Sequence, residues 1–189
     1  MNKAFYTLEV AGLRRDLPLI KINEELSIAS FVILGDTELV FTCAKYLVEN
    51  LPECDVLVAA EAKSIPLVYE MAKCLNMKHY VVARKSLKTY MGEAIIDAVK
   101  SITTDNEQIL ALAQDDLQYI KGKRVVLVDD VISTGASIET LERLVKQAQG
   151  EIVAKAAILA EGDAALRKDI IFLEKLPLFK KTVKHTKNT

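Results

Sequence analysis

Four short apolar runs, rich in β-branched residues, lie in the middle and later parts of the chain. They cover residues 55–60, 79–83, 123–128 and 152–159. Continuous apolar runs of this length, bounded by polar residues, are typical of strands that are buried on both faces. The run at 123–128 is the clearest, since it reads Lys-Arg-Val-Val-Leu-Val.

The segments between these runs carry apolar residues at helical spacing. Asp36 is a predicted N-cap, and a second helix is expected to open at Ser64 and Pro66 and to reach about residue 75. A third covers residues 137–149 and stops at Gly150. Strands that alternate with helices favour an α/β fold, a parallel sheet flanked by helices. The apolar stripe after Asp36 consists of Leu39, Val40, Cys43, Ala44, Leu47 and Val48.

Three segments break this alternation. Residues 1–34 have a mixed pattern of their own and are expected to form a small cap, or hood. Residues 86–122 are interpreted as a long loop followed by a β-hairpin, although residues 107–118 fit a helix equally well. A long insertion beside a strand end is typical of a lid or binding loop. Residues 180–189 are basic, and we expect a flexible, solvated tail rather than a nucleic-acid-binding one.

Composition narrows the class of protein. A length of 189 residues, 51% of them hydrophobic, suits a single domain over residues 1–189 with a sizeable core. The net charge of −1 favours neither a nucleic-acid nor a membrane partner. The N-terminus lacks the apolar core of a signal peptide, and no apolar run approaches the ~20 residues of a membrane span. Cys43, Cys54 and Cys74 form no CxxC pair and indicate reduced thiols, so we expect a cytoplasmic protein.

Residues 125–137 join three features that together predict chemistry. A buried strand ends in Asp129 and Asp130, and open α/β sheets bind ligands at the carboxyl ends of their strands. A loop of small and hydroxyl residues follows, in which Gly135 lets the backbone approach a ligand closely. A helix then begins, and its free N–H groups and positive dipole end attract an anion. A phosphate beside two carboxylates indicates a sugar phosphate with vicinal hydroxyls.

This loop differs from two other phosphate-binding loops. No Gly-Lys-Ser/Thr follows it, as a Walker A loop requires, and it lacks the GxGxxG of a dinucleotide site. A strand-to-helix turn with capping residues and solvated acids would explain Asp-Asp or Ser-Thr-Gly alone. It does not explain the whole ordered segment.

The segment strongly resembles the signature of type I phosphoribosyltransferases that binds 5-phosphoribosyl 1-diphosphate (PRPP). The resemblance implies a Rossmann-like parallel sheet flanked by helices, with an N-terminal hood and a lid loop or hairpin. It implies that Asp129 and Asp130 are the catalytic-site acids, which bind the ribose 2- and 3-hydroxyls. The residues implied to hold the PRPP 5-phosphate are Ser133, Thr134, Gly135, Ala136 and Ser137.

Two more segments resemble the diphosphate-binding part of the same family. Residues 60–64 are similar to the Glu-Ala-Arg-Gly or Glu-Ser-Ser-Gly loop of adenine- and xanthine-type members, with lysine replacing arginine and serine replacing glycine. Residues 82–88 resemble a strand that ends in Arg-Lys, whose cations would neutralise the leaving diphosphate. An ordinary connection and a solvated charge cluster would also explain these segments. The implied diphosphate-binding residues are Glu61, Ala62, Lys63, Ser64, Arg84, Lys85 and Lys88.

The resemblance implies a reaction in which a base nitrogen displaces diphosphate from the anomeric carbon of PRPP, with water excluded. Mg²⁺ is the expected cofactor, held mainly by PRPP and water, so no metal site built from the protein alone is expected. A homodimer is expected, because the family is commonly dimeric. Residues 12–18 resemble the start of adenine-type enzymes, and residues 19–26 resemble the xanthine type. Either likeness places a purine base under the hood.

Adenine is the favoured base, in purine salvage, and xanthine, guanine or orotate are the alternatives. An approximate alignment places Glu161 where xanthine-type members have a lysine, and Ser27 where they have an asparagine. A glutamate suits the exocyclic amine of adenine better than an anionic base. A non-catalytic regulator that senses PRPP or a nucleotide is a third hypothesis, but the Asp pair, Arg84-Lys85 and the long loop favour catalysis. Glu93 is a candidate general base, and a surface carboxylate is the favoured interpretation.

Overall fold

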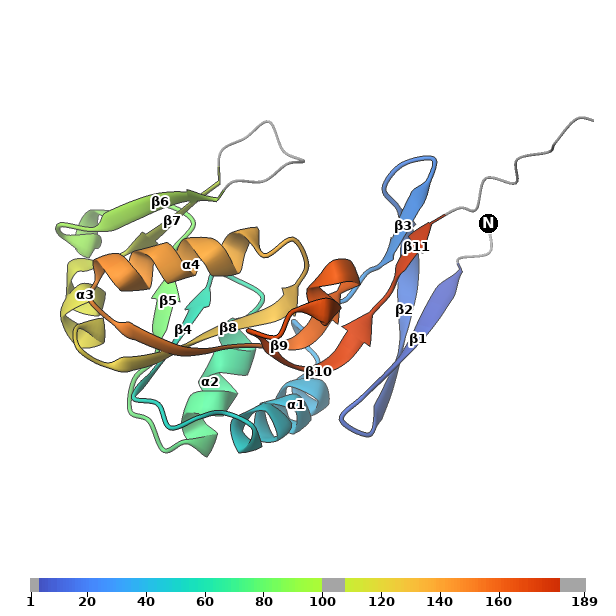
Figure 1. The fold of residues 1–189 in the computed structure, drawn as a ribbon, viewed down its shortest axis with the longest axis horizontal. Coiled ribbons are helices and arrows are strands. Elements are labelled where there is room, and N and C mark those ends of the chain that lie inside the picture. Colours follow the sequence, from blue (N-terminus) through green and yellow to red (C-terminus); the bar gives the residue numbers. More distant parts are fainter. Residues whose placement is uncertain (1–3, 100–107, 181–189) are drawn as a thin grey trace, which may run out of the picture.

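The computed structural model describes residues 4–99 and 108–180 and has a five-stranded parallel sheet at its centre (Figure 1). The strand order is β10-β9-β8-β4-β5, and every neighbouring pair is parallel. The strands are β4 (Val56–Ala60), β5 (Val81–Ala83), β8 (Arg124–Ile132), β9 (Glu151–Glu161) and β10 (Ile171–Leu176). The predicted fold class is confirmed.

Helices cover both faces of this sheet, because side chains alternate between the two faces along each strand. Leu57 and Val126 belong to the core under α1 (Thr37–Glu49) and α2 (Ile65–Cys74). Their neighbours Val56, Val58, Val125 and Leu127 belong to the core under α3 (Gln114–Ile120) and α4 (Ala136–Gln147). Figure 1 shows α1 and α2 below the sheet and α4 above it.

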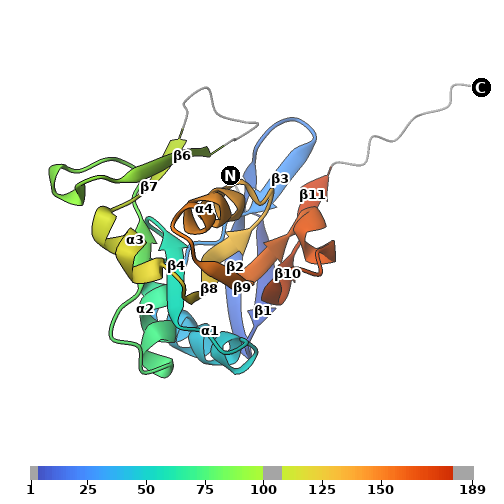
Figure 2. The same ribbon diagram turned by 60° about the vertical axis from the view of Figure 1, so that its left-hand side comes forward.

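A second, four-stranded sheet stands beside the carboxyl ends of β8 and β9 (Figures 1 and 2). Its order is β1-β2-β3-β11, and all its pairs are antiparallel. This hood sheet combines the N-terminal strands with one from the far end of the chain. Its members are β1 (Phe5–Val10), β2 (Leu13–Lys21), β3 (Leu26–Ala29) and β11 (Leu178–Lys180).

The segment between β5 and β8 forms a 3-10 turn, a hairpin and a helix. The turn is η1 (Thr89–Met91), and the hairpin pairs β6 (Ile95–Val99) with β7 (Gln108–Leu112). Both readings of residues 107–118 are therefore partly right, because β7 passes directly into α3. Residues 100–107 of the predicted lid loop and hairpin, and residues 181–189 of the predicted tail, lie outside the described residues.

The predicted strands and helices are present, with shifted ends. The Asp36 carboxylate caps α1, because it accepts a hydrogen bond from the Leu39 amide at 3.0 Å. The strand predicted at residues 123–128 continues through both acids to Ile132, and the helix after it starts at Ala136. Strands β10 and β11 were not predicted from the sequence. No helix in the described part of the chain is long and apolar enough to cross a membrane.

Candidate active site

Asp129 and Asp130 lie near the carboxyl end of β8, and both contact the connection between β4 and α2. Asp129 pairs with Ala157 of β9 and is partly buried, whereas Asp130 is only 2% exposed. Burial and the neighbouring Asp130 carboxylate raise the pKa of Asp129. Two adjacent acids at a sheet edge can accept hydrogen bonds from neighbouring hydroxyls.

Each acid has a partner from residues 61–64, the connection between β4 and α2. The Ser64 hydroxyl donates to Oδ1 of Asp129 at 2.7 Å, and the Lys63 Nζ lies 3.2 Å from Oδ2 of Asp130. The lysine contact has ion-pair distance but poor hydrogen-bond geometry, since Oδ2 of Asp130 accepts no hydrogen bond from any described residue. That buried oxygen is a free acceptor. The Lys63 side chain is 52% exposed, so solvent weakens its ion pair with Asp130.

Residues 133–137 form the turn between β8 and α4 for which phosphate binding is predicted, and we call it the anion-binding turn. Gly135 has φ +87°, which favours glycine, and it is the N-cap of α4. Gly135 is buried, yet its amide donates to no described group, and the first amides of α4 have no acceptor within the helix. A cavity of about 140 Å³ lies against this turn. The Ala136 amide contacts the Thr134 hydroxyl at 3.4 Å, and the other amides of this turn and the positive helix end would attract an anion.

The neighbouring cavity, of about 230 Å³, brings most of the predicted diphosphate residues to the acid pair. The hairpin lines it with Val99 and Gln108, which were not among the predicted site residues. No local pattern marks these two residues, because the packing of the hairpin brings them there. The predicted residues that line it are Glu61, Ala62, Lys63, Ser64 and Lys85, together with Asp129, Asp130, Ser133 and Ser137.

Arg84 and Lys88 line neither of these two cavities. The Arg84 guanidinium donates to Glu61 at 3.1 Å and to the Tyr90 hydroxyl at 2.9 Å, and it lines a separate cavity of about 390 Å³. Glu61 also accepts from the Lys85 amide, and these contacts lower its pKa. Arg84 therefore holds one end of the loop at residues 61–64 instead of facing the acids.

The third cavity of the candidate site, of about 300 Å³, lies between residues 28–32 and the carboxyl ends of β8 and β9. Phe31 and Val32 line it from the hood side, and Val131 and Glu161 line it from β8 and β9. Burial raises the pKa of the Glu161 carboxyl, and Lys63 partly opposes this. We call this space the hood cavity. Apolar side chains stand here beside one carboxyl, Lys63 and two serines, and this mixture suits a ring that carries hydrogen-bonding groups.

The hairpin is fastened to α4 by a small polar cluster. Arg143 of α4 donates to the Asp97 carboxylate of β6, to the Ala98 carbonyl and to the Thr140 hydroxyl. The same helix begins at the anion-binding turn, so one rigid element positions both the turn and the hairpin residues beside it.

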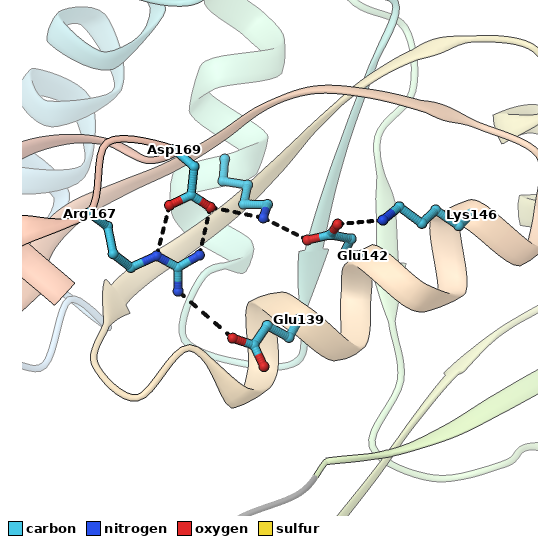
Figure 3. Close-up of polar contacts among 6 residues, drawn as sticks. Glu139, Glu142, Lys146, Arg167 and Asp169 are labelled. Carbon is cyan, nitrogen blue, oxygen red and sulfur yellow. Dashed lines mark hydrogen bonds and ion pairs between the residues drawn. The ribbon is translucent and has the colours of Figure 1, made fainter.

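A second cluster braces the other side of α4 (Figure 3). Asp169 accepts two hydrogen bonds from Arg167, at 2.9 and 2.7 Å, and this fixes the guanidinium beside the turn. Lys155 lies between Asp169 and Glu142 at ion-pair distances of 3.1 and 2.6 Å. Arg167 was not predicted as a site residue, because Gly135 and Glu139, which its guanidinium approaches, are distant along the chain.

Glu93 lies on the surface and lines none of these three cavities, in line with the surface interpretation. Ser27 lies in β3, opposite Phe179, and does not line the hood cavity either. No group of three His, Cys, Asp or Glu side chains within residues 4–99 and 108–180 is arranged to hold a metal ion.

Known proteins resemble this chain in sequence. The family model described as phosphoribosyl transferase domain matches residues 40–185. The chain is 29% identical over 143 residues to the adenine phosphoribosyltransferase of Mycoplasma capricolum, covering 71% of this chain and 74% of that protein. It is 32% identical to that of Acetivibrio thermocellus, covering 64% and 69%.

Solved structures of adenine phosphoribosyltransferases have a similar fold. The crystal structure of an adenine phosphoribosyltransferase from Thermoanaerobacter pseudethanolicus superimposes with a TM-score of 0.64 at 24% identity, covering 76% of this chain and 84% of that one. The family match covers more than half of the chain and includes the acid pair, the anion-binding turn and residues 61–64. This chain belongs to the phosphoribosyl transferase domain family.

Proposed function

We propose that this chain transfers the phosphoribosyl group of PRPP to adenine, giving AMP and diphosphate, as in purine salvage. The observation that carries the proposal is the acid pair of β8, which lies between an anion-binding turn and the loop at residues 61–64. The names of the two sequence relatives support adenine as the base.

In this proposal each part of PRPP has its own set of residues. The turn from Ser133 to Ser137 binds the 5-phosphate through backbone amides. Asp129 and Asp130 accept hydrogen bonds from the ribose hydroxyls, and Oδ2 of Asp130 has no hydrogen-bond donor among the described residues. Residues 61–64 and Lys85 hold the diphosphate, and Lys63 can leave Asp130 for it because its side chain is half exposed.

The reaction forms a bond between a ring nitrogen of adenine and the anomeric carbon and breaks the bond from that carbon to the diphosphate oxygen. The base nitrogen loses its proton, and diphosphate leaves with the bonding electrons. The protein holds both reactants in line and stabilises the charge on the leaving group with Lys63 and Lys85. No described residue is assigned as general base.

Mg²⁺ suits this site as a partner of PRPP. Hard oxygen donors are present in the two carboxylates, and the buried free oxygen of Asp130 can accept from a water of the ion. The ion would be held mainly by PRPP and water, and it would neutralise the diphosphate. We also propose, from the family resemblance, that the protein works as a cytoplasmic homodimer.

The hood cavity is the proposed adenine site. The Glu161 carboxyl can accept from the exocyclic amine of adenine and, when protonated, can donate to the neighbouring ring nitrogen. Burial favours that protonated form. Xanthine, which ionises more readily and has an oxygen in place of this amine, fits less well.

A coupled assay with PRPP, Mg²⁺ and a panel of bases tests the proposal. The panel contains adenine, guanine, hypoxanthine, xanthine and orotate, and we expect adenine to have the highest kcat/KM. A higher kcat/KM for xanthine or guanine would show that this base, and not adenine, is the preferred substrate. Turnover of orotate alone would show that the substrate is not a purine. PRPP binding with no turnover of any base would favour a sensor of the same fold.

A further inference from the structure

Ser64 occupies an N-cap position but does not cap its helix. It precedes α2, where a serine oxygen ordinarily accepts a hydrogen bond from an amide of the first turn. Here the side chain makes no such bond. The hydroxyl is turned instead toward β8, and Ser64 is only 2% exposed.

The hydroxyl connects both acids of the site. It donates to Oδ1 of Asp129 at 2.7 Å and accepts from the Asp130 amide at 3.1 Å. The Asp130 amide also contacts Oδ1 of Asp129 at 2.9 Å. Oδ1 of Asp129 is therefore fully engaged, whereas Oδ2 accepts from none of the residues that the structure describes.

We propose that Ser64 is a positioning residue, which fixes the Asp129 carboxylate so that its second oxygen faces the ribose hydroxyls. It thereby joins the proposed diphosphate loop to the proposed ribose-binding acids. This inference rests on the proposed function, and it assigns a role to Ser64, which lies outside the anion-binding turn. The contact spans 65 residues of sequence, so the fold alone creates it.

Two features favour positioning over a purely structural role. A serine that only stabilised α2 would cap it, and this one does not. The hydroxyl also favours the ionised form of Asp129, against the burial and the Asp130 charge that raise its pKa. An ionised carboxylate is the stronger acceptor for a sugar hydroxyl.

The test measures binding of ribose 5-phosphate, inorganic phosphate and diphosphate by isothermal titration calorimetry. The variants are Ser64→Ala and Ser64→Cys. Cysteine is close to serine in size but is a weak donor, so it separates hydrogen bonding from packing. Thr42→Ala, a hydroxyl deletion on α1 away from the three cavities, is the control.

We expect both Ser64 variants to bind ribose 5-phosphate about 10-fold more weakly, as suits a lost hydrogen bond to a charged group. Inorganic phosphate, bound at the anion-binding turn, should bind as it does to the wild type. In an Asp129→Asn background the Ser64→Ala change should have a much smaller effect, because the two residues act as a unit. The pH below which ribose 5-phosphate affinity falls should be higher in Ser64→Ala.

Three results would overturn the inference. They are unchanged ribose 5-phosphate affinity in Ser64→Ala, wild-type affinity in Ser64→Cys, or an equal loss for phosphate and ribose 5-phosphate in a folded variant. Failure of the proposed function gives a different outcome, since the wild type would then bind ribose 5-phosphate but turn over no base. A wild type that binds ribose 5-phosphate no more tightly than phosphate would overturn both proposals.

Discussion

The guanidinium of Arg167 packs directly against Gly135. A Cβ atom on Gly135 would lie 2.6 Å from Nη1 of Arg167 and 3.2 Å from a carboxylate oxygen of Glu139. Figure 3 shows Arg167 held in this place by Asp169. The anion-binding turn is thus closed on its outer side by a cation from the segment between β9 and β10.

This contact makes Gly135→Ala a sharp test of the turn. The variant combines an unfavourable φ of +87° with a clash against Arg167, so we expect PRPP KM to rise at least about 10-fold and stability to fall by about 1–2 kcal/mol. Gly35→Ala is the matched control, because Gly35 has φ +88° and open space around it. Gly35→Ala should lose similar stability and keep its KM. Equal KM values for both variants would remove Gly135 from the phosphate site.

Replacing both acids should separate binding from folding. Asp129→Asn with Asp130→Asn is expected to abolish PRPP binding measured by calorimetry, because the ribose hydroxyls lose their charged acceptors. The melting temperature should stay equal or rise, since the change removes two neighbouring carboxylates that repel each other. Retained micromolar PRPP binding would exclude this pair from the ribose site.

The raised pKa of Asp129 predicts opposite pH trends for stability and for binding. Its carboxylate is less favourable in the folded state than in the unfolded one, where its pKa is about 3.9. The free energy of unfolding should therefore decrease, relative to Asp129→Asn, as pH rises from about 3.9 to the folded pKa. PRPP affinity should instead weaken as pH falls through that folded pKa.

Urea unfolding of the wild type and Asp129→Asn over this pH range checks the first trend. The difference between the two proteins cancels other acids, such as Asp55 and Asp169, whose pKa values are lowered by arginine partners. A difference that is constant with pH would mean that Asp129 titrates normally.

Glu161 should control the choice of base. Glu161→Gln keeps an acceptor and a donor for adenine, so kcat/KM for adenine should stay within about 10-fold of the wild type. Glu161→Lys should lower kcat/KM for adenine at least about 10-fold. It should also raise kcat/KM for xanthine relative to adenine, because the lysine can donate a hydrogen bond to the xanthine oxygen that replaces the amine. Glu174→Gln, an exposed position on β10, is the control. An unaltered base ranking in Glu161→Lys would place the base elsewhere.

Local patterns along the chain were sufficient for the central architecture. A buried parallel strand is a continuous apolar run, and a helix has an apolar stripe, so β4, β8, β9, α1, α2 and α4 follow from neighbouring residues alone. The same holds for the Asp129-Asp130 pair and the Gly135 turn, since a strand end, a loop and a helix start occupy consecutive positions. Chemistry contained in one continuous segment can be predicted from sequence.

Contacts between distant segments required the tertiary structure. β11 is three residues long and pairs with β3 from the other end of the chain, so no local pattern marks it as part of the hood. Arg84 and Lys85 are adjacent in an Arg-Lys motif, yet only Lys85 lines the cavity, because Glu61 and Tyr90 hold the arginine away. The Ser64–Asp129 and Arg167–Gly135 contacts likewise depend on how the elements pack. Sequence determined which residues could do the chemistry, and packing decided which of them meet, because long-range contacts depend on the whole fold.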